Sequence, residues 1–262
     1  MEPQLDATSS IEKNKISRTI LVTGSEGRIG QIVTSRLSET HATIICLDKV
    51  IQKVRDDAYA VDIRDTEDLE RTFKKIGRVD SIIHLAGDPR PEDSYGPILS
   101  NNVIGTENLL EAAVRHGVKR VVIASSTHTV GGYEGYPSRL PLDRPDRPMT
   151  TEDEPKDDGP YGWSKVEIEK LAKKFHDENG LETICIRFGF VTEDNKPAKG
   201  FEPHWLSYRD AAQVVQKALD SKVPYGVYFA TSGIAPPMFD ISSTIHDLGY
   251  KPQDSYRILH AG

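Results

Sequence analysis

Three glycines spaced three residues apart, Gly24, Gly27 and Gly30, follow an apolar run and precede a helical pattern. Residues 19–22 predict a strand, and residues 30–37 predict the helix after the turn. Glycine lets the backbone turn tightly and approach a pyrophosphate, whose charge would meet the N-terminus of the helix. The spacing differs from the dinucleotide fingerprint G-x-G-x-x-G, but its place between a strand and a helix favours a dinucleotide-binding turn over a simple tight turn.

The rest of the chain continues this alternation of apolar runs and amphipathic segments. Further strands are predicted at residues 43–47, 59–61, 81–86, 120–124 and 183–187, and helices at residues 66–75, 98–116 and 161–176. Continuous apolar strands between helices indicate a parallel sheet that is covered on both faces. The predicted fold class is therefore α/β, with a Rossmann-type doubly wound parallel sheet and a small C-terminal substrate lobe.

The chain has 262 residues, which is long enough for one large α/β domain. We expect a flexible polar tail at residues 1–17 and a single nucleotide-binding domain at 18–262. Residues from about 189 to 262 are expected to form the substrate-side lobe, with a helix at 208–220, a strand near 227–229 and a short helix ending at Leu248. The segment 134–160 contains six prolines and is predicted to be a long ordered loop or a lid.

Charge and composition exclude several functions. The net charge of -7 makes a nucleic-acid backbone an improbable partner. No apolar run approaches the ~20 residues that span a bilayer, and the polar N-terminus lacks the apolar core of a signal peptide, so a cytoplasmic protein without a membrane partner is expected. Cys46 and Cys185 lie in apolar runs and are expected to be reduced, buried thiols, and no residue cluster has the spacing of a metal site.

Polar residues stand where the predicted strands end, and in a parallel sheet these ends meet at one edge. Asp48 follows Gly30 by 18 residues. A carboxylate there can accept hydrogen bonds from the adenosine ribose and repel a 2′-phosphate, which favours NAD over NADP, although Lys49 beside it weakens the inference. Asp62 could reach the adenine edge or be a simple turn residue.

Tyr161 and Lys165 lie four residues apart, on one face of the predicted helix. The ordinary pKa of a tyrosine, near 10, is too high for acid/base work at neutral pH. We expect Lys165 to lower the pKa of Tyr161, so that the tyrosine can accept a hydroxyl proton while hydride leaves the same carbon for a nicotinamide. A Tyr-x-x-x-Lys spacing alone is common on solvated helix faces, and its value here depends on the neighbouring motifs.

These motifs together resemble the extended-type short-chain dehydrogenases/reductases of the NAD-dependent epimerase/dehydratase family. The resemblance rests on Gly24-x-x-Gly27-x-x-Gly30, His84-Leu85-Ala86-Gly87, Asn102-Val103-x-Gly105-Thr106, Ser125-Ser126 and Tyr161-x-x-x-Lys165, and runs from about residue 19 to 252. Within the family the chain is similar to the uronate dehydrogenases and to small archaeal NAD-dependent glucose-6-phosphate dehydrogenases. The carrying segments are residues 84–91, 124–128 and 205–210.

The resemblance implies roles for particular residues. The third catalytic residue would be Ser126 or Thr127, and the register leaves both open. Beyond the glycines and the two aspartates, NAD contacts are expected from Arg28, Ile29, Ile63, Leu85, Ala86, Gly87, Asn102, Tyr161 and Lys165. Substrate contacts are expected from Asp88, Arg90, Ser126, Thr127, His128 and Lys199; of these Arg90, His128 and Lys199, together with Arg209, could meet a carboxylate or phosphate, or serve only at the surface.

Three functions are compatible with this set. The first is an NAD-dependent dehydrogenase that oxidises a hydroxyl, the anomeric one by preference, of an acidic or phosphorylated sugar to a lactone. The second is a nucleotide-sugar epimerase or dehydratase with tightly bound NAD, against which stand the short C-terminal lobe and His128-Thr129 in place of acidic residues. The third is a redox-sensing binding protein, which would have no need of the Ser-Tyr-Lys set. The family also implies a homodimer or higher homo-oligomer.

Overall fold

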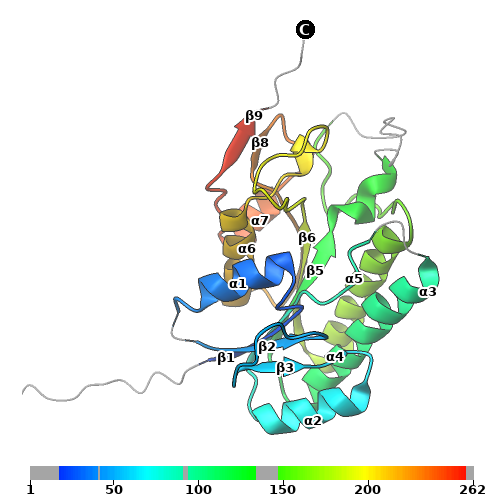
Figure 1. The fold of residues 1–262 in the computed structure, drawn as a ribbon. Coiled ribbons are helices and arrows are strands. Elements are labelled where there is room, and N and C mark those ends of the chain that lie inside the picture. The colour runs from blue at the N-terminus through cyan, green and yellow to red at the C-terminus, as the bar shows by residue number, and fades with distance from the viewer. Residues whose placement is uncertain (1–17, 41, 91–93, 134–146, 258–262) are drawn as a thin grey trace, which may run out of the picture.

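The computed structural model describes residues 18–40, 42–90, 94–133 and 147–257. The tail expected at 1–17 and the first half of the proline-rich segment, up to residue 146, lie outside the described residues. A seven-stranded sheet with the order β3-β2-β1-β4-β5-β6-β7 forms the centre of the molecule, and every neighbouring pair is parallel. The predicted doubly wound parallel sheet is confirmed (Figure 1).

The strands are short and apolar, in positions close to those predicted. They are β1 (Thr19–Thr23), β2 (Thr43–Asp48), β3 (Ala58–Ala60), β4 (Ser81–His84), β5 (Arg120–Ser126), β6 (Glu182–Phe188) and β7 (Tyr225–Ala230). Alternate residues of one strand face opposite layers: Ile20 and Val22 belong to one buried cluster, and Leu21 belongs to the other. Both faces of the sheet are therefore core, which explains the continuous apolar runs.

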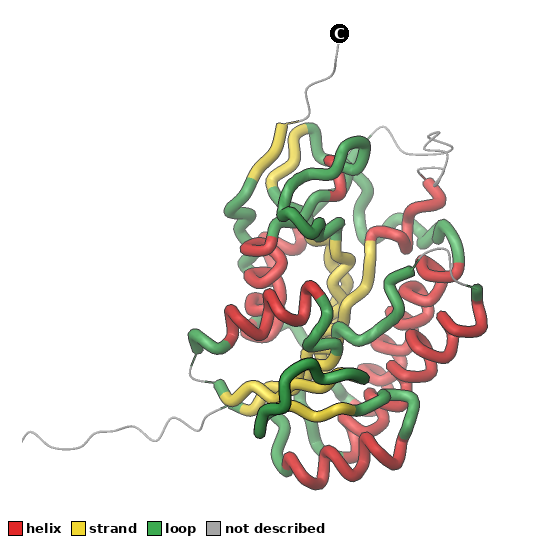
Figure 2. Tube along the Cα trace, viewed as in Figure 1, coloured by secondary structure: helices red, strands yellow, loops and turns green. Residues whose placement is uncertain are grey.

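Helices cover both faces of the sheet (Figure 2). One layer contains α1 (Arg28–Leu37) and α6 (Tyr208–Asp220), with α7 (Ser242–Leu248) beside them. The opposite layer contains α2 (Thr66–Ile76), α4 (Gly105–Arg115) and α5 (Pro160–Asn179). Because the strands are parallel, the segments that connect their carboxyl ends to the helices gather at one edge of the sheet.

The helix predicted from Ile98 to His116 is built differently from a regular helix. It begins earlier, with α3 (Tyr95–Ile98), continues through a π-helical stretch at residues 99–104, and ends as α4. The strand predicted at 81–86 ends two residues early, at His84, because the residues after it turn toward the glycine turn. The π-helical turn at residues 99–104 is wider than an α-helical turn, and turns of this type are frequent at functional sites.

Part of the range expected for the substrate-side lobe belongs to the main sheet. β7 pairs with β6 along its whole length, and α6 packs against α1. Outside these layers lies a two-stranded parallel sheet of β8 (Gly233–Ala235) and β9 (Ser255–Arg257). The buried Asp210 connects it to α6, because its carboxylate accepts hydrogen bonds from Ser232 Oγ and from the backbone N–H groups of Gln253 and Asp254.

No helix in the described part of the chain is long and apolar enough to cross a membrane. Within residues 18–257, leaving out the gaps given above, no group of three or more His, Cys, Asp or Glu side chains is arranged to hold a metal ion. Cys46 and Cys185 are both buried and free.

Candidate active site

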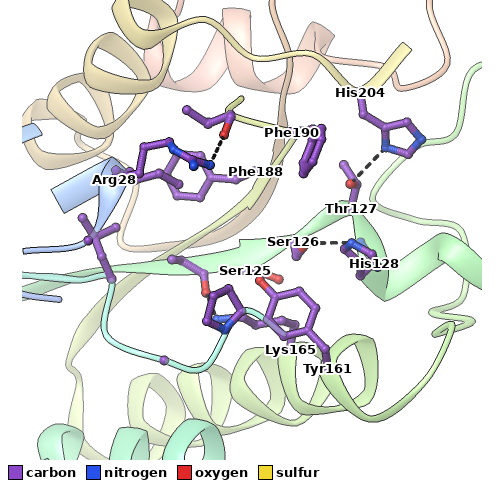
Figure 3. Close-up of a pocket in the computed structure, with 18 of the residues that line it drawn as sticks. Arg28, Ser125, Ser126, Thr127, His128, Tyr161, Lys165, Phe188, Phe190 and His204 are labelled. Carbon is purple, nitrogen blue, oxygen red and sulfur yellow. Dashed lines mark hydrogen bonds between the residues drawn. The ribbon is translucent and has the colours of Figure 1, made fainter. Parts of the chain in front are cut away.

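A cavity of about 490 Å³ opens at the carboxyl ends of β1, β4, β5 and β6. Gly24, Gly27, Arg28, Ile29 and Gly30 line one end of it. The other end is lined by residues from the end of β5, from the start of α5 and from the loop after β6 (Figure 3). The cavity thus joins the glycine turn to the Tyr161–Lys165 pair, as the sequence predicts.

The glycine turn leaves no room for larger residues at two positions. Gly24 has φ +69°, and a Cβ there would lie 2.6 Å from the backbone N of Ala86. A Cβ on Gly30 would lie 2.1 Å from the carbonyl oxygen of Gly24. Gly27 precedes α1 and lines the cavity together with Arg28, Ile29 and Gly30 of the first helical turn, whose N–H groups have no partner within the helix. This end therefore fits a pyrophosphate held by backbone N–H groups and the helix dipole.

Asp48, at the end of β2, supports the glycine turn through one hydrogen bond. Its carboxylate accepts a hydrogen bond from the backbone N–H of Glu26, at 2.9 Å. Arg28 is held from the other side, because its Nη1 donates to the carbonyl oxygen of Val191, at 2.9 Å. Asp48 does not line the cavity itself, but it lies directly behind the turn that does.

Asp62 and Ile63 lie further out along the same edge, and neither lines the cavity. Hydrogen bonds with Arg64 hold the pKa of Asp62 well below its usual range, and Lys49 forms a second ion pair with it at 3.3 Å. The side chain of Ile63 is buried against Gly105 at the start of α4. Both residues therefore have partners within the protein, which are Arg64 and Lys49 for Asp62 and Gly105 for Ile63.

Asn102 ties the loop after β4 to α5. Its Oδ1 accepts from the backbone N–H of Asp88, at 2.6 Å, and its Nδ2 donates to the carbonyl oxygen of Asp88 and to Ser164 Oγ, both at 3.0 Å. The π-helical turn presents this amide to the loop, which carries Leu85 and Gly87 on the cavity wall. Ala86 lies against Gly24 and does not itself line the cavity. Asn102 is fully buried and shapes the cavity without lining it.

Tyr161 and Lys165 both line the cavity from the first turns of α5. Lys165 Nζ lies 5.5 Å from the centre of the Tyr161 ring and donates to the carbonyl oxygen of Ala124, at 2.9 Å. Burial raises the pKa of Tyr161 to about 12, against a smaller lowering by a hydrogen bond with Ser126. The pKa of Tyr161 is therefore raised and not lowered as expected, because burial is the largest influence on it and the Lys165 ammonium donates its hydrogen bond to Ala124.

The two candidate hydroxyls at the end of β5 have different partners. Ser126 interacts with Tyr161, and its Oγ accepts a hydrogen bond from the backbone N–H of His128, at 3.2 Å. Thr127 Oγ1 lies 3.2 Å from His204 Nδ1 (Figure 3). Ser126 is the last residue of β5 and Thr127 begins a 3-10 helix, and of the two hydroxyls Ser126 is the one that interacts with Tyr161.

His128 is positioned by a buried carboxylate. Its Nδ1 lies 2.6 Å from Asp158 Oδ2, and its ring meets the Tyr161 ring edge-on with centroids 5.3 Å apart. Asp88 also lines the cavity and forms an ion pair with Arg90. The wall near the tyrosine therefore has carboxylates as well as an imidazole.

Of the four cations suggested for an anionic substrate, only His128 lies on the cavity wall. Arg90 is exposed and points to Asp88. Lys199 is exposed and outside the lining. Arg209 forms an ion pair with Asp254 beside β9, where it supports the C-terminal sheet.

Several cavity residues were not found from the sequence. Phe188, Phe190, Val191, Phe201 and His204 form a largely aromatic wall after β6, and Asp158 lies before α5. Phe188 is the last residue of β6 and His204 ends a short 3-10 helical turn, whereas the others come from loops without a helical or strand period. The one available signal was the bunching of aromatic residues in the polar stretch around Phe201 and His204.

The fold and this cavity define a nucleotide-binding α/β enzyme with a Ser-Tyr-Lys set. The model of the NAD dependent epimerase/dehydratase family matches residues 20–207, and the chain belongs to this family. Its cofactor is therefore NAD, and the open glycine turn fits that group. The resemblance described from the motifs is confirmed.

Three known proteins show how far the similarity extends. The chain is 30% identical over 249 residues to the NAD-dependent glucose-6-phosphate dehydrogenase of Haloferax volcanii, covering 92% of this chain and 95% of that protein. It is 32% identical over 202 residues to the UDP-glucose 4-epimerase of Halalkalibacterium halodurans, covering 70% of this chain and 57% of that protein. The crystal structure of uronate dehydrogenase from Agrobacterium tumefaciens matches with a TM-score of 0.79 and 27% identity, over 91% of this chain and 85% of that one.

Proposed function

We propose that the protein is an NAD-dependent sugar dehydrogenase that oxidises the anomeric hydroxyl of a sugar and thereby forms a lactone. The observation that carries this proposal is the placement of Tyr161 beside Ser126 in a cavity whose far end is the glycine turn. A cofactor phosphate at the turn and a carbinol at the tyrosine would then occupy one continuous space.

In this mechanism Ser126 orients the substrate hydroxyl and Tyr161 accepts its proton. NAD, when bound, supplies the hydride acceptor. Burial raises the pKa of Tyr161 to about 12, so the tyrosine acts as a base only where a neighbouring positive charge stabilises its phenolate form. The ammonium of Lys165, held at Ala124, is the positive charge that this chain supplies.

The NAD contacts follow from the same geometry. Gly24, Gly27 and the first turn of α1 hold the pyrophosphate, and Leu85 and Gly87 form the opposite wall. Asp48 lies where the adenosine ribose would leave the turn, and its negative charge favours NAD over NADP. The proposed NAD contacts also include Asp62, Ile63, Ala86 and Asn102. Asn102 contributes by holding the loop of residues 87–88 in place.

Two observations favour a dehydrogenase over a nucleotide-sugar epimerase. The match to the glucose-6-phosphate dehydrogenase extends over 95% of that protein, whereas the sequence match to the 4-epimerase extends over 57% of that protein. Its cavity, about 490 Å³, also has to hold the nicotinamide end of NAD and the substrate together. A monosaccharide fits this space better than a nucleotide sugar.

The relatives' names suggest an acidic or phosphorylated sugar as substrate, and His128, which lines the cavity beside Tyr161, would meet its anion. A neutral aldose is a second candidate, because two of the charged groups on the described wall near Tyr161 are the carboxylates of Asp88 and Asp158. Carboxylates accept hydrogen bonds from sugar hydroxyls and repel a substrate anion.

We also propose that the protein assembles as a homodimer through α3, the π-helical stretch and α4, with α5 beside them. Tyr95, Leu99 and Ile104 are large apolar residues that lie exposed on this surface, and Tyr95 contacts Trp163 of α5 edge-on. Exposed apolar residues that cluster on one helical surface are typical of an interaction site.

A substrate panel tests the proposed activity. The purified protein is supplied with NAD and, in turn, with uronic acids, hexose 6-phosphates, neutral aldoses and nucleotide sugars, while NADH absorbance is followed. We expect steady NADH formation with one of the first three classes. Turnover of a nucleotide sugar without net NADH, and no NADH with any free sugar, would instead establish the epimerase.

A further inference from the structure

A buried ion pair lies behind the reactive end of the cavity, outside its lining. Glu169 of α5 and Arg187 of β6 form two parallel hydrogen bonds, Nε to Oε1 and Nη2 to Oε2, each 2.8 Å long. Ser125 Oγ donates to the same carboxylate, at 2.5 Å. The side chain of Arg187 is 2% exposed and that of Glu169 is 9% exposed. The carboxylate is therefore held by three donors in the protein interior.

This arrangement is costly for the fold, so stability is a poor explanation for it. Removing two charges from water carries a large desolvation penalty, and buried pairs can often be replaced by apolar residues without loss of stability. In addition, Arg187 Nη1 has no hydrogen-bond partner among the described residues, and the guanidinium lies over the Phe229 ring at 5.1 Å. A pair with an unsatisfied donor suggests a purpose other than stability.

Glu169 is placed in line with the reactive residues. It lies one helical turn after Lys165 and two turns after Tyr161, on the same face of α5. Lys165 binds the carbonyl oxygen of Ala124, and Glu169 binds the hydroxyl of Ser125, the next residue along β5. These two contacts fasten α5 to the end of β5, immediately before Ser126.

Glu169 is also the carboxylate that opposes the effect of burial on Lys165. Burial lowers the pKa of Lys165 to about 8, while negative charge at Cys185 and Glu169 raises it. Burial raises the pKa of the Cys185 thiol well above its usual value, so Cys185 is uncharged at neutral pH and Glu169 remains as the anion. Five other titratable or charged groups lie on the elements around Lys165. They are His84 of β4, Asp88 in the loop after β4, Asp158 before α5, Tyr161 of α5 and Arg187 of β6.

We propose that Glu169 is a positioning residue of the reaction, which keeps the ammonium of Lys165 charged beside Tyr161 and fixes the Ser125–Ser126 end of β5. Arg187 holds the Glu169 carboxylate in place through two parallel hydrogen bonds. The catalytic part of this inference rests on the proposed function. The effect of Glu169 on the titration of Lys165 does not, because it can be measured without a substrate.

The direct test is the NMR titration of Lys165 Nζ in ¹⁵N-lysine-labelled protein, with the signal assigned from a Lys165→Met variant. Glu169→Gln alone leaves the Arg187 charge unpaired and can prevent folding, so the main variant is Glu169→Gln/Arg187→Met, which removes both charges. We expect the titration midpoint of Lys165 to fall relative to the wild type, by less than the loss of Glu169 alone would give, because the loss of the Arg187 cation partly offsets the loss of the carboxylate. An unchanged midpoint would overturn the proposal. Because no substrate is needed, this result does not depend on the sugar assignment.

A matched control breaks a second ion pair between the same two strands. Arg120 and Glu182 join β5 to β6 at the opposite end, with 2.6 Å between Nη2 and Oε2. Glu182→Gln should leave the Lys165 midpoint unchanged, together with the pH at which kcat/KM falls on the alkaline side. In the double variant this alkaline limb should move to lower pH with the Lys165 midpoint. Equal shifts in both variants would mean that Glu169 has only a structural role.

Ser125→Ala separates the two parts of the proposal. The variant removes the hydroxyl that links Glu169 to β5 but keeps the carboxylate and its charge. We expect the Lys165 midpoint to stay at its wild-type value while kcat falls by a few fold, on the order of 3- to 10-fold, because Ser126 is less well held. A wild-type kcat would contradict the role of Glu169 in fixing the end of β5.

Discussion

Asn102 and Asp88 are joined through both backbone groups of Asp88, since the amide of Asn102 accepts from its N–H and donates to its carbonyl oxygen. This double contact fixes the loop that forms one wall of the cavity between the glycine turn and Tyr161. The geometry requires the π-helical turn at residues 99–104, which moves Asn102 out of a regular helical register.

The two candidate hydroxyls give a direct comparison. Ser126→Ala should lower kcat by roughly 10²-fold or more, because the hydroxyl that interacts with Tyr161 is lost. Thr127→Ala removes a hydroxyl of the same kind whose partner is His204, and should change KM for the sugar more than kcat. Steady-state kinetics on both variants measure this. The reverse ranking of kcat would assign the catalytic hydroxyl to Thr127.

Asp48 should set the preference for NAD over NADP. Asp48→Asn keeps an oxygen that can accept from Glu26 N–H, and so preserves the glycine turn, but removes the negative charge that repels a 2′-phosphate. We expect the ratio of the NAD and NADP dissociation constants to shift toward NADP by about tenfold, measured by calorimetry. Asp62→Asn is the control, since the Asp62 charge is paired with Arg64. An equal shift in both variants would contradict a specific role for Asp48.

His84 should make the protein less stable in mild acid. It is buried between Thr23 and Thr106, and burial, with the charge of Lys165, lowers its pKa to about 3. Between pH 3 and 6.5 the unfolded chain therefore binds a proton that the folded protein does not, so stability rises with pH through this window and no longer changes above it. For this one group the free energy of unfolding should fall by about 1.4 kcal/mol for each pH unit below 6.5.

Urea unfolding of the wild type and of His84→Gln between pH 7 and 5 measures this contribution. The variant is expected to be less stable at pH 7, because it loses the fit between the two threonines, but to lose less stability on acidification. The same dependence on pH in both proteins would show that His84 is not the group responsible.

The proposed dimer depends on exposed apolar residues of the α3–α4 region. Leu99→Glu and Ile104→Glu should each shift the mass measured by light scattering toward the monomer, because a buried, unpaired carboxylate is costly at an interface. Val54→Glu changes a fully exposed apolar residue in the loop between β2 and β3 and should leave the mass unchanged. A wild-type protein that is monomeric at all concentrations would end this proposal.

The fold was predictable because the parallel sheet is buried on both faces, which leaves continuous apolar strands in the sequence. The edge at which Gly24, Asp48, Ser126 and Tyr161 gather follows from the same rule. The π-helical winding of residues 99–104 was not predictable, because its apolar residues show no pattern that separates it from an α-helix; the structure shows that this turn carries Asn102, which hydrogen-bonds Asp88. The lowering of the Tyr161 pKa was predicted wrongly, because spacing shows that Lys165 is near but not how deeply both are buried.

The aromatic wall and Asp158 could not be found from periodicity, because loop residues acquire neighbours only from the fold. The same limit applies to the anion contacts, where residue type alone suggested four cations and the structure places His128 alone on the wall. Arg209 illustrates the cause, since its charge is used by Asp254 to hold the C-terminal sheet.

The central claim, that Tyr161 is the base of a hydride-transfer reaction in this cavity, is tested most directly by Tyr161→Phe. The measurement is kcat with the best sugar of the panel, beside the dissociation constant of NAD from calorimetry. The account predicts that kcat falls by about 10²- to 10⁴-fold while NAD binding stays within a few fold of the wild type. A variant that binds NAD and retains the wild-type kcat would contradict it.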